Sequence, residues 1–367
     1  MLKQYVIFFC ISFICAGNIY SQVNNNLSYP EVAIAGTQLR HIHSDITNED
    51  YDLYVNLPGD YGDTSKTFPV VYLIDAQWDF PLVSAIYGEQ YYDGFMPAAV
   101  VVGITWSGKN PGYDSLRARD FTPTTMSQPS RFGNAPDFLK SIKNEIIPYI
   151  KKNYRVTSNR TLIGSSYGGL FTLYTLFTET NVFNQYILTS PAILFDNGVI
   201  SKIEREYAEK NSKLPVRLYI AYGGYEDAAS FQNFIDTLKN MNFTGLEFRS
   251  NEIEGMGHSG AKAEGFSRGL QFAFSRPTIK LSDDILKQYT GTYKLAPDII
   301  IKIAVDNGHL LVMAPDNKKY ILQAESEKDF YTKGSFNEAH FEKDTRGNVK
   351  GFVYVQYNAK NFVPKVN

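Results

Sequence analysis

The residues with the clearest chemical potential surround a serine that stands between two glycines. Residues 161–170 read TLIGSSYGGL, so the pattern Gly164-x-Ser166-x-Gly168 follows a predicted strand and precedes a predicted helix. This order of strand, tight turn and helix is typical of a nucleophile elbow, in which small residues let the two backbones pass closely. The turn places the serine Oγ at the carboxyl end of the strand, above a helix N-terminus that favours a developing oxyanion. We predict that Ser166 is a nucleophile; the alternative is a glycine-lined turn used only for packing.

A serine nucleophile needs a base, and the positions of the five histidines narrow the choice. Two of them precede residue 50 and two follow residue 300. Only His258 lies in the region of alternating strands and helices after the serine, in the segment EGMGHSG that follows a predicted strand at 246–253. A loop at the carboxyl end of a strand is where a triad histidine must lie to reach the serine. We predict that His258 is the general base, against the alternative of a solvent-exposed loop histidine.

The third member of such a triad is an acid, which is expected between the serine and the histidine in the chain. The predicted strand at 217–221 is followed by YGGYED, which places Glu226 and Asp227 at the correct end of a strand. Asp227 also has a structural explanation, because it precedes the helical pattern at 228–241 as its N-cap. Glu226 is therefore the predicted acid. Asp227 in that role, or a serine–histidine pair without an acid, are the alternatives.

Two backbone N–H groups are expected to hold the negative oxygen of the reaction intermediate. One belongs to Tyr167, the residue after the serine, and the other to the loop that follows the predicted strand at 70–74. That loop reads DAQW, and we assign the second donor to the N–H of Gln77.

Three side chains near the predicted strand ends are candidates for substrate contact. Trp78 and Trp106 each follow such an end, and Arg117 lies in a loop where a guanidinium would suit an anionic or catecholate-bearing substrate. Each has a structural alternative. The tryptophans can be packing residues, and an arginine–aspartate pair, formed by Arg117 or Arg119 with Asp120, can brace the loop.

The elements that must position these residues follow from hydrophobic periodicity. Runs that are apolar on both faces are typical of parallel strands covered by helices. Such runs occur at 68–74, 98–104, 161–163, 185–188 and 217–221. They alternate with helical patterns at 135–154 and 228–241, which predicts an α/β fold with a mostly parallel central sheet. After residue 277 the alternation stops, and short strands with the hairpin signal Asn307-Gly308 predict a small all-β domain.

The chain has 367 residues, a length that predicts one large domain and a smaller one. Residues 1–21 combine Lys3 with a short apolar run and predict a signal peptide cleaved after Ser21. We therefore expect a catalytic domain at 22–276, a small β-barrel-like domain at 283–367, and export to the periplasm or the exterior.

The composition argues against several classes of cofactor and binding partner. Both cysteines, Cys10 and Cys15, fall within the signal peptide, so the mature chain is expected to have no disulfide, no thiolate metal site and no cysteine nucleophile. The apolar run of about 12 residues is too short to span a bilayer, so no stable membrane insertion is expected after its removal. The 36 basic and 38 acidic side chains nearly balance, which argues against a nucleic-acid partner.

From about residue 51 to residue 274 the sequence resembles the putative-esterase family of α/β-hydrolases, which includes esterase D-type enzymes and the ferric enterobactin and bacillibactin esterases. The resemblance rests on VYLIDAQ at 71–77, RARDFTP at 117–123, GSSYGGL at 164–170, TSPA at 189–192, the turn at 223–226, and Gly257-His258. The RARDFTP block resembles the siderophore-esterase branch in particular, whereas Ala76 stands where the family often has glycine. The part after residue 283 resembles the lipocalin-like β domain found behind some secreted serine hydrolases.

This resemblance implies an α/β-hydrolase fold and hydrolysis of carboxylic esters through an acyl-enzyme, without a metal or other cofactor. The implied partner is a small-molecule or saccharide ester, either a siderophore or an acylated carbohydrate. Acyl transfer to another alcohol on the same fold, and a non-catalytic binding protein, are the alternatives.

Overall fold

The computed structural model describes residues 32–128, 131–356 and 359–366. The predicted signal peptide at 1–21 lies outside these residues. Within the described part of the chain, no helix is both long and apolar enough to cross a membrane.

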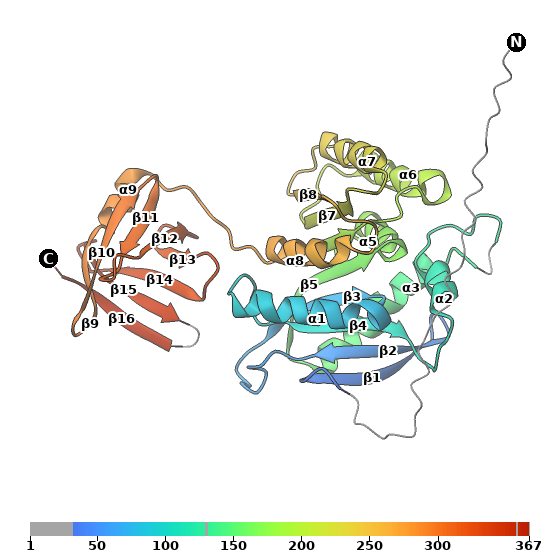
Figure 1. Ribbon diagram of the computed structural model, residues 1–367, viewed down its shortest axis with the longest axis horizontal. Coiled ribbons are helices and arrows are strands. Elements are labelled where there is room, and N and C mark those ends of the chain that lie inside the picture. Colours follow the sequence, from blue (N-terminus) through green and yellow to red (C-terminus); the bar gives the residue numbers. More distant parts are fainter. Residues whose placement is uncertain (1–31, 129–130, 357–358, 367) are drawn as a thin grey trace, which may run out of the picture. The chain divides into compact units, whose positions relative to one another are not determined.

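The first part of the described chain forms an eight-stranded sheet, with the strand order β1-β2-β4-β3-β5-β6-β7-β8 (Figure 1). Its strands are β1 (Thr37–Ser44), β2 (Glu49–Asn56), β3 (Phe68–Ile74), β4 (Val100–Trp106), β5 (Val156–Ser165), β6 (Gln185–Thr189), β7 (Arg217–Gly223) and β8 (Glu247–Ile253). The pairs β1–β2 and β2–β4 are antiparallel, and the other neighbouring pairs are parallel. The predicted mostly parallel sheet is thus confirmed.

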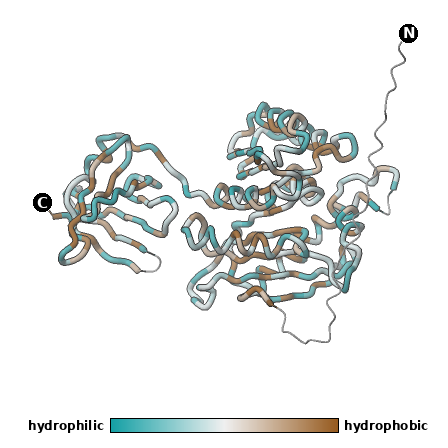
Figure 2. Tube along the Cα trace, viewed as in Figure 1, coloured by the Kyte–Doolittle hydropathy of each residue, from teal (hydrophilic) through white to brown (hydrophobic). Residues whose placement is uncertain are grey.

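Helices cover both faces of this sheet. Alternate residues of its strands point to opposite faces, and on each face they pack with helices in a separate apolar layer. In β3, Val70 and Tyr72 belong to the layer that includes residues of α5, whereas Val71 and Leu73 belong to the layer that includes residues of α1 and α8. Figure 1 shows α1 and α8 beside each other on one face, and Figure 2 shows hydrophobic residues concentrated along the central strands. Double-sided burial explains why these strands are nearly continuous apolar runs.

The helices of this part lie between the strands in the chain. They are α1 (Ala76–Tyr92), α2 (Tyr113–Asp120), α3 (Ala135–Ser141), α4 (Ile147–Asn153), α5 (Tyr167–Thr178), α6 (Phe195–Lys210), α7 (Ala228–Asn240) and α8 (Ala261–Ala273). A π-helical turn, η1 (Ile142–Ile146), joins α3 to α4. The single helix predicted at 135–154 is therefore a helix with a widened turn in its middle.

The C-terminal domain is a closed antiparallel barrel with the strand order β10-β11-β12-β13-β14-β15-β16-β9. Its elements are α9 (Asp283–Gln288), β9 (Gly291–Ala296), β10 (Ile299–Asp306), β11 (His309–Met313), β12 (Lys319–Ala324), β13 (Asp329–Thr332), β14 (Asn337–Lys343), β15 (Val349–Gln356) and β16 (Ala359–Val366). The predicted Asn307-Gly308 hairpin joins β10 to β11, and both turn residues have the positive φ that this turn requires. The predicted all-β C-terminal part is confirmed.

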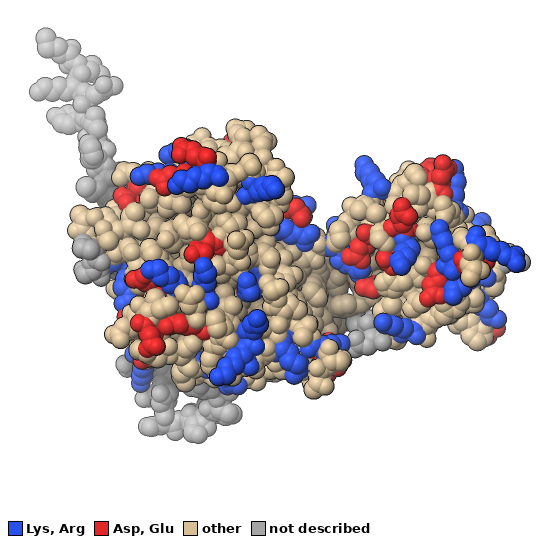
Figure 3. All heavy atoms as spheres, turned by 180° about the vertical axis from the view of Figure 1, so that it is seen from behind, with Lys and Arg blue, Asp and Glu red and all other residues tan. Residues whose placement is uncertain are grey.

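The surface carries charges of both signs. On the face drawn in Figure 3, lysine and arginine side chains are interspersed with aspartate and glutamate side chains rather than gathered into one broad patch. This pattern agrees with the near balance of 36 basic and 38 acidic residues in the sequence.

Candidate active site

Ser166 occupies a strained turn between the end of β5 and the first residue of α5. Its backbone angles are φ 57° and ψ −120°, a region that residues other than glycine rarely occupy. The turn is tight enough that a Cβ atom at position 164 would lie 2.3 Å from the carbonyl oxygen of Gly168, so only glycine fits there. The Ser166 side chain is at the surface of this turn, since the residue is only partly buried whereas its neighbour Ser165 is 1% exposed. The local geometry is that of a nucleophile elbow.

Backbone hydrogen bonds hold Ser166 against the loop that follows β6. The Ser166 N–H donates to the Thr189 carbonyl oxygen at 3.1 Å, and the Ala192 N–H donates to the Ser166 carbonyl oxygen at 3.0 Å. Between these two partners, the Ser190 hydroxyl donates to Glu226 Oε1 at 2.5 Å. The turn that carries Ser166 is thereby connected to the loop that follows β7.

Glu226 contacts His258 directly. The histidine Nδ1 lies 2.7 Å from Glu226 Oε2, and the Gly223 N–H donates to Glu226 Oε1 at 2.8 Å. Burial acts to raise the pKa of Glu226, but hydrogen bonds from Ser190, His258 and Gly223 outweigh it and hold the pKa below its ordinary value. An ionised carboxylate at this place accepts the Nδ1–H of the ring and leaves Nε2 as the nitrogen available to other groups.

A glycine lets the histidine loop approach β7 closely. A Cβ atom at position 223 would lie 2.4 Å from the carbonyl oxygen of Met256, so the loop of His258 packs against the bare backbone at the end of β7. Ser166, Glu226 and His258 follow β5, β7 and β8 respectively, and these strands point the same way in the sheet. Their carboxyl ends meet at one edge, where ligands of open α/β sheets bind.

Asp227 has a different role from its neighbour. Its side chain accepts a hydrogen bond from the Ser230 N–H at 3.2 Å and from the Ser230 hydroxyl at 2.7 Å, which caps α7. These hydrogen bonds lower the pKa of Asp227. The structure therefore brings Glu226, and not Asp227, to His258.

The two predicted oxyanion donors both lie in first turns of helices. Tyr167 is the first residue of α5 and Gln77 is the second residue of α1, positions whose N–H groups have no partner within the helix. The Gln77 side chain is occupied elsewhere, because its Oε1 accepts a hydrogen bond from the Thr105 hydroxyl at 2.8 Å. Its backbone N–H is thus the group of Gln77 that is suited to an oxyanion.

Arg117 is engaged mainly by the protein itself. Its guanidinium donates to both carboxylate oxygens of Asp75, from Nε at 3.0 Å and from Nη2 at 2.8 Å. The same guanidinium lies 5.4 Å from the centre of the Trp78 ring and 5.6 Å from the centre of the Tyr167 ring. Asp75 is 1% exposed and has φ 59°, so this ion pair fixes a strained residue immediately before α1, two positions from Gln77. The guanidinium predicted to meet substrate instead lies on α2 and contacts both Asp75, which precedes α1, and Tyr167, which begins α5.

The arginine–aspartate pair that the sequence offered as the structural alternative is present, but Arg119 forms it with Asp120, whereas Arg117 pairs with Asp75. Asp120 receives hydrogen bonds from Arg119, from Asn134 and from the indole N–H of Trp106. Trp106 is 2% exposed, and its ring packs against Phe121 and Phe138. The substrate contact predicted for Trp106 does not fit this core position, and packing is its role.

Several residues near exposed loop ends present apolar surface at the same edge of the sheet. Trp78 after β3, Leu194 after β6, Tyr225 after β7 and Met256 after β8 are all exposed, with Tyr225 at 81%. Exposed apolar side chains that gather around one site typically mark a binding surface. Trp78 is the only one of these four that the sequence analysis singled out.

Two contacts that connect the elements around this site could not be predicted, because no local sequence pattern indicates them. The Ser190 hydroxyl donates to Glu226, and in the sequence Ser190 is only one residue of the TSPA segment. Lys262 on α8 contacts both carboxylate oxygens of Asp79 on α1 at 2.9 Å, and Asp79 is 4% exposed. This ion pair joins α1, which carries Gln77, to α8, which follows the His258 loop, across 183 positions of sequence.

Comparisons with known proteins identify the family of this chain and several relatives. The family model described as "Putative esterase" matches residues 44–236, a little over half of the chain. The ferri-bacillibactin esterase BesA of Bacillus subtilis is 29% identical over 262 residues, which cover 65% of this chain and 90% of that protein. The siderophore triacetylfusarinine C esterase of Aspergillus fumigatus is 29% identical over 166 residues, 43% of this chain and 56% of that protein.

Solved structures share the fold. The BES protein from Bacillus cereus superposes with a TM-score of 0.62 at 25% identity, covering 68% of this chain and 99% of that one. The siderophore hydrolase EstB from Aspergillus nidulans gives a TM-score of 0.60 at 23% identity, covering 68% of this chain and 98% of that one.

Proposed function

Because this chain belongs to the putative esterase family and is a carboxylic ester hydrolase, we propose that it works as an exported serine esterase in which Ser166, His258 and Glu226 form the catalytic triad. The observation that carries this proposal is the chain of hydrogen bonds from the Ser166 backbone through the Ser190 loop to Glu226 and His258. It supports the triad because it fixes the histidine ring by its Nδ1 while the strained turn presents Ser166 at the same edge of the sheet.

In this mechanism, Nε2 of His258 takes the proton of the Ser166 hydroxyl as its oxygen attacks the ester carbonyl carbon. The ionised Glu226 stabilises the imidazolium that forms. The N–H groups of Tyr167 and Gln77 hold the negative oxygen of the tetrahedral intermediate, assisted by the N-terminal ends of α5 and α1. The imidazolium then protonates the leaving alcohol, and the same ring deprotonates the water that releases the acid.

Arg117 acts in this mechanism as a positioning residue. It holds Asp75, and through Asp75 the first turn of α1 that presents the Gln77 N–H, while its contact with the Tyr167 ring restrains the second donor. An oxyanion hole is effective only when its donors are held in place before the reaction. Arg117 therefore serves the site without a hydrogen bond to substrate.

The proposed substrate is a siderophore ester. Two relatives are named for esters of bacillibactin and triacetylfusarinine C. The exposed apolar side chains Trp78, Leu194, Tyr225 and Met256 suit a bulky substrate with aromatic or apolar parts better than a small polar one. An acylated carbohydrate would use the same catalytic residues.

The test compares wild-type protein with Ser166→Ala on short p-nitrophenyl esters, a ferric trilactone siderophore and a feruloylated sugar. We expect Ser166→Ala to lose at least 1,000-fold in kcat/KM, wild-type Ser166 to be labelled by a fluorophosphonate, and the siderophore to be hydrolysed fastest. Turnover by Ser166→Ala near the wild-type rate, or labelling of another serine, contradicts the mechanism. Preference for the sugar ester contradicts the substrate but leaves the mechanism intact.

A further inference from the structure

The two ends of the C-terminal barrel are filled differently. The end that carries the turns at 307–308, 325–328 and 344–348 is packed by α9 and by Tyr289, the residue that follows it, which is 1% exposed. The Tyr289 ring centre lies 4.5 Å from that of Phe341 and 5.6 Å from that of Phe330. This end is a close-packed aromatic core, as is usual for small barrels.

The opposite end holds a cavity of about 310 Å³ instead of packed side chains. Its apolar lining comes from inward positions on six of the strands: Leu295, Ile301, Val312, Leu322, Ala339 and Phe352. Ile301, Leu322, Ala339 and Phe352 are each less than 7% exposed, so they form an apolar floor and walls. A volume of this size is at the lower end of the range for small-molecule sites.

One lining residue, Glu338, carries a carboxylate, which bonds to Arg276 and His340, and the other polar groups at this cavity are uncharged hydroxyls and amides. The Tyr354 hydroxyl donates to Asn337 Oδ1 at 2.8 Å, which orients the Asn337 amide so that its N–H groups are the ones left to donate. Thr332 and Tyr320 add hydroxyl groups to the lining, and Tyr320 is 40% exposed at the rim. A ligand that fits this arrangement is mainly apolar and offers an oxygen acceptor to the amide and hydroxyl groups.

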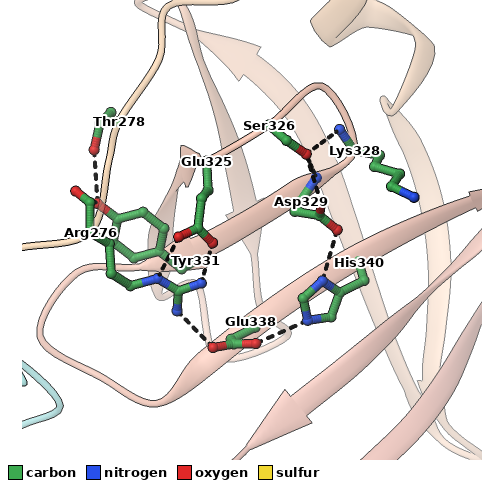
Figure 4. Close-up of polar contacts among 9 residues, drawn as sticks. All are labelled: Arg276, Thr278, Glu325, Ser326, Lys328, Asp329, Tyr331, Glu338 and His340. Atoms are coloured by element: carbon green, nitrogen blue, oxygen red, sulfur yellow. Dashed lines mark hydrogen bonds and ion pairs between the residues drawn. The ribbon is translucent and has the colours of Figure 1, made fainter. Parts of the chain in front are cut away.

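The charges of these strands lie on the outside of the barrel, because side chains alternate along a strand. On β14, Asn337, Glu338 and Ala339 all contribute to the lining of the cavity, but the Glu338 carboxylate, like the His340 ring, belongs to the polar network of Figure 4. There His340 lies 2.9 Å from both Glu338 and Asp329, and Arg276 contacts Glu338 at 2.7 Å. Among the described residues that line the cavity none is lysine or arginine, so an anion finds no cationic partner there.

We propose that this open end of the barrel is a binding site for a small neutral molecule with an aromatic ring or a short acyl chain and one carbonyl acceptor. The apolar floor takes the ring or chain, and the Asn337 amide donates to the carbonyl oxygen. The site is separate from the residues that follow β5, β7 and β8, and the proposal does not depend on the esterase mechanism.

The test uses the full-length protein and two fluorescent probes. Prodan is a neutral naphthalene ketone, and 1-anilinonaphthalene-8-sulfonate is an anion of comparable size. We expect prodan to bind saturably at one site per chain and at least tenfold more tightly than the anion.

Variants locate the prodan site. Thr332→Phe and Ala314→Phe place a ring into the cavity from two different elements, so a folding failure in one leaves the other as a test. Each is expected to weaken prodan binding at least tenfold, while Ile321→Phe, on the outer face of β12 and 50% exposed, leaves it within twofold. Hydrolysis of p-nitrophenyl acetate should be unchanged in all three variants.

Two results overturn the proposal. One is prodan binding that persists in whichever cavity variant folds, as judged by circular dichroism, because the probe then binds elsewhere. The other is equal affinity for the anion, because the cavity offers it no counter-charge.

Discussion

Glu204 on α6 makes a sharp prediction about the pH dependence of stability. Its side chain is fully buried, and within the described chain neither of its carboxylate oxygens has a hydrogen-bond partner. Burial raises the pKa of Glu204 to about 8 from an ordinary value of 4.5, and the nearby charge of Arg205 offsets only part of this effect. The folded protein therefore keeps this carboxyl group neutral at neutral pH.

The sign of the effect follows from proton linkage. Between pH 4.5 and pH 8 the folded state holds a proton at Glu204 that the unfolded state has released. The free energy of unfolding therefore falls as the pH rises through this window, and the full penalty is present above pH 8. At about 1.4 kcal/mol per pKa unit, the loss between pH 5.5 and pH 8.5 is about 3 kcal/mol.

The substitution Glu204→Gln removes the ionisation and keeps the size of the side chain. Any cost of burying the amide is the same at both pH values, so it cancels when the two are compared. We expect the stability of the variant relative to wild type to rise by about 3 kcal/mol from pH 5.5 to pH 8.5. A matched control is Glu206→Gln on the same helix, where the side chain is 52% exposed and the expected change is below about 0.5 kcal/mol.

Urea unfolding followed by tryptophan fluorescence measures this effect. The chain has two tryptophans, Trp78 and Trp106, and both lie in the α/β part that contains Glu204. The signal therefore reports the unfolding of that part and is insensitive to the barrel. A difference between Glu204→Gln and wild type that is the same at both pH values would refute the reasoning, because it would show that Glu204 does not change its ionisation on unfolding in this range.

Three further predictions concern the site. Glu226→Gln should lower kcat/KM by about 100-fold to 10,000-fold. Asp227→Asn should keep kcat/KM within threefold of wild type and lower the free energy of unfolding in urea by at most about 1 kcal/mol. Equal losses of activity in the two variants contradict the assignment of Glu226 as the acid. Arg117→Lys should lower kcat for a small neutral ester about tenfold or more with little change in KM, because the oxyanion donors are no longer held in position. A rise in KM that is confined to anionic substrates would show that Arg117 binds substrate instead. Gly164→Ala should abolish soluble folded protein by circular dichroism, while Gly59→Ala, with open space around it, should fold normally.

The sequence determined those features whose cause is local. Runs that are apolar on both faces require burial on both faces, so the parallel strands could be located without coordinates. The Asn307-Gly308 turn and the capping role of Asp227 were also readable, because each depends on residues within three positions of one another. The same holds for the turn at Ser166, where two glycines relieve a close approach within one short segment.

Only the tertiary structure decided which distant side chains meet. Arg117 pairs with Asp75, 42 positions away, and Trp106 turns into the core to reach Asp120. No periodicity encodes such contacts, because they depend on how loops at the ends of neighbouring strands are brought together. Burial has the same origin: Glu204 looks like an ordinary helical glutamate in the sequence, and only packing removes it from water and raises its pKa.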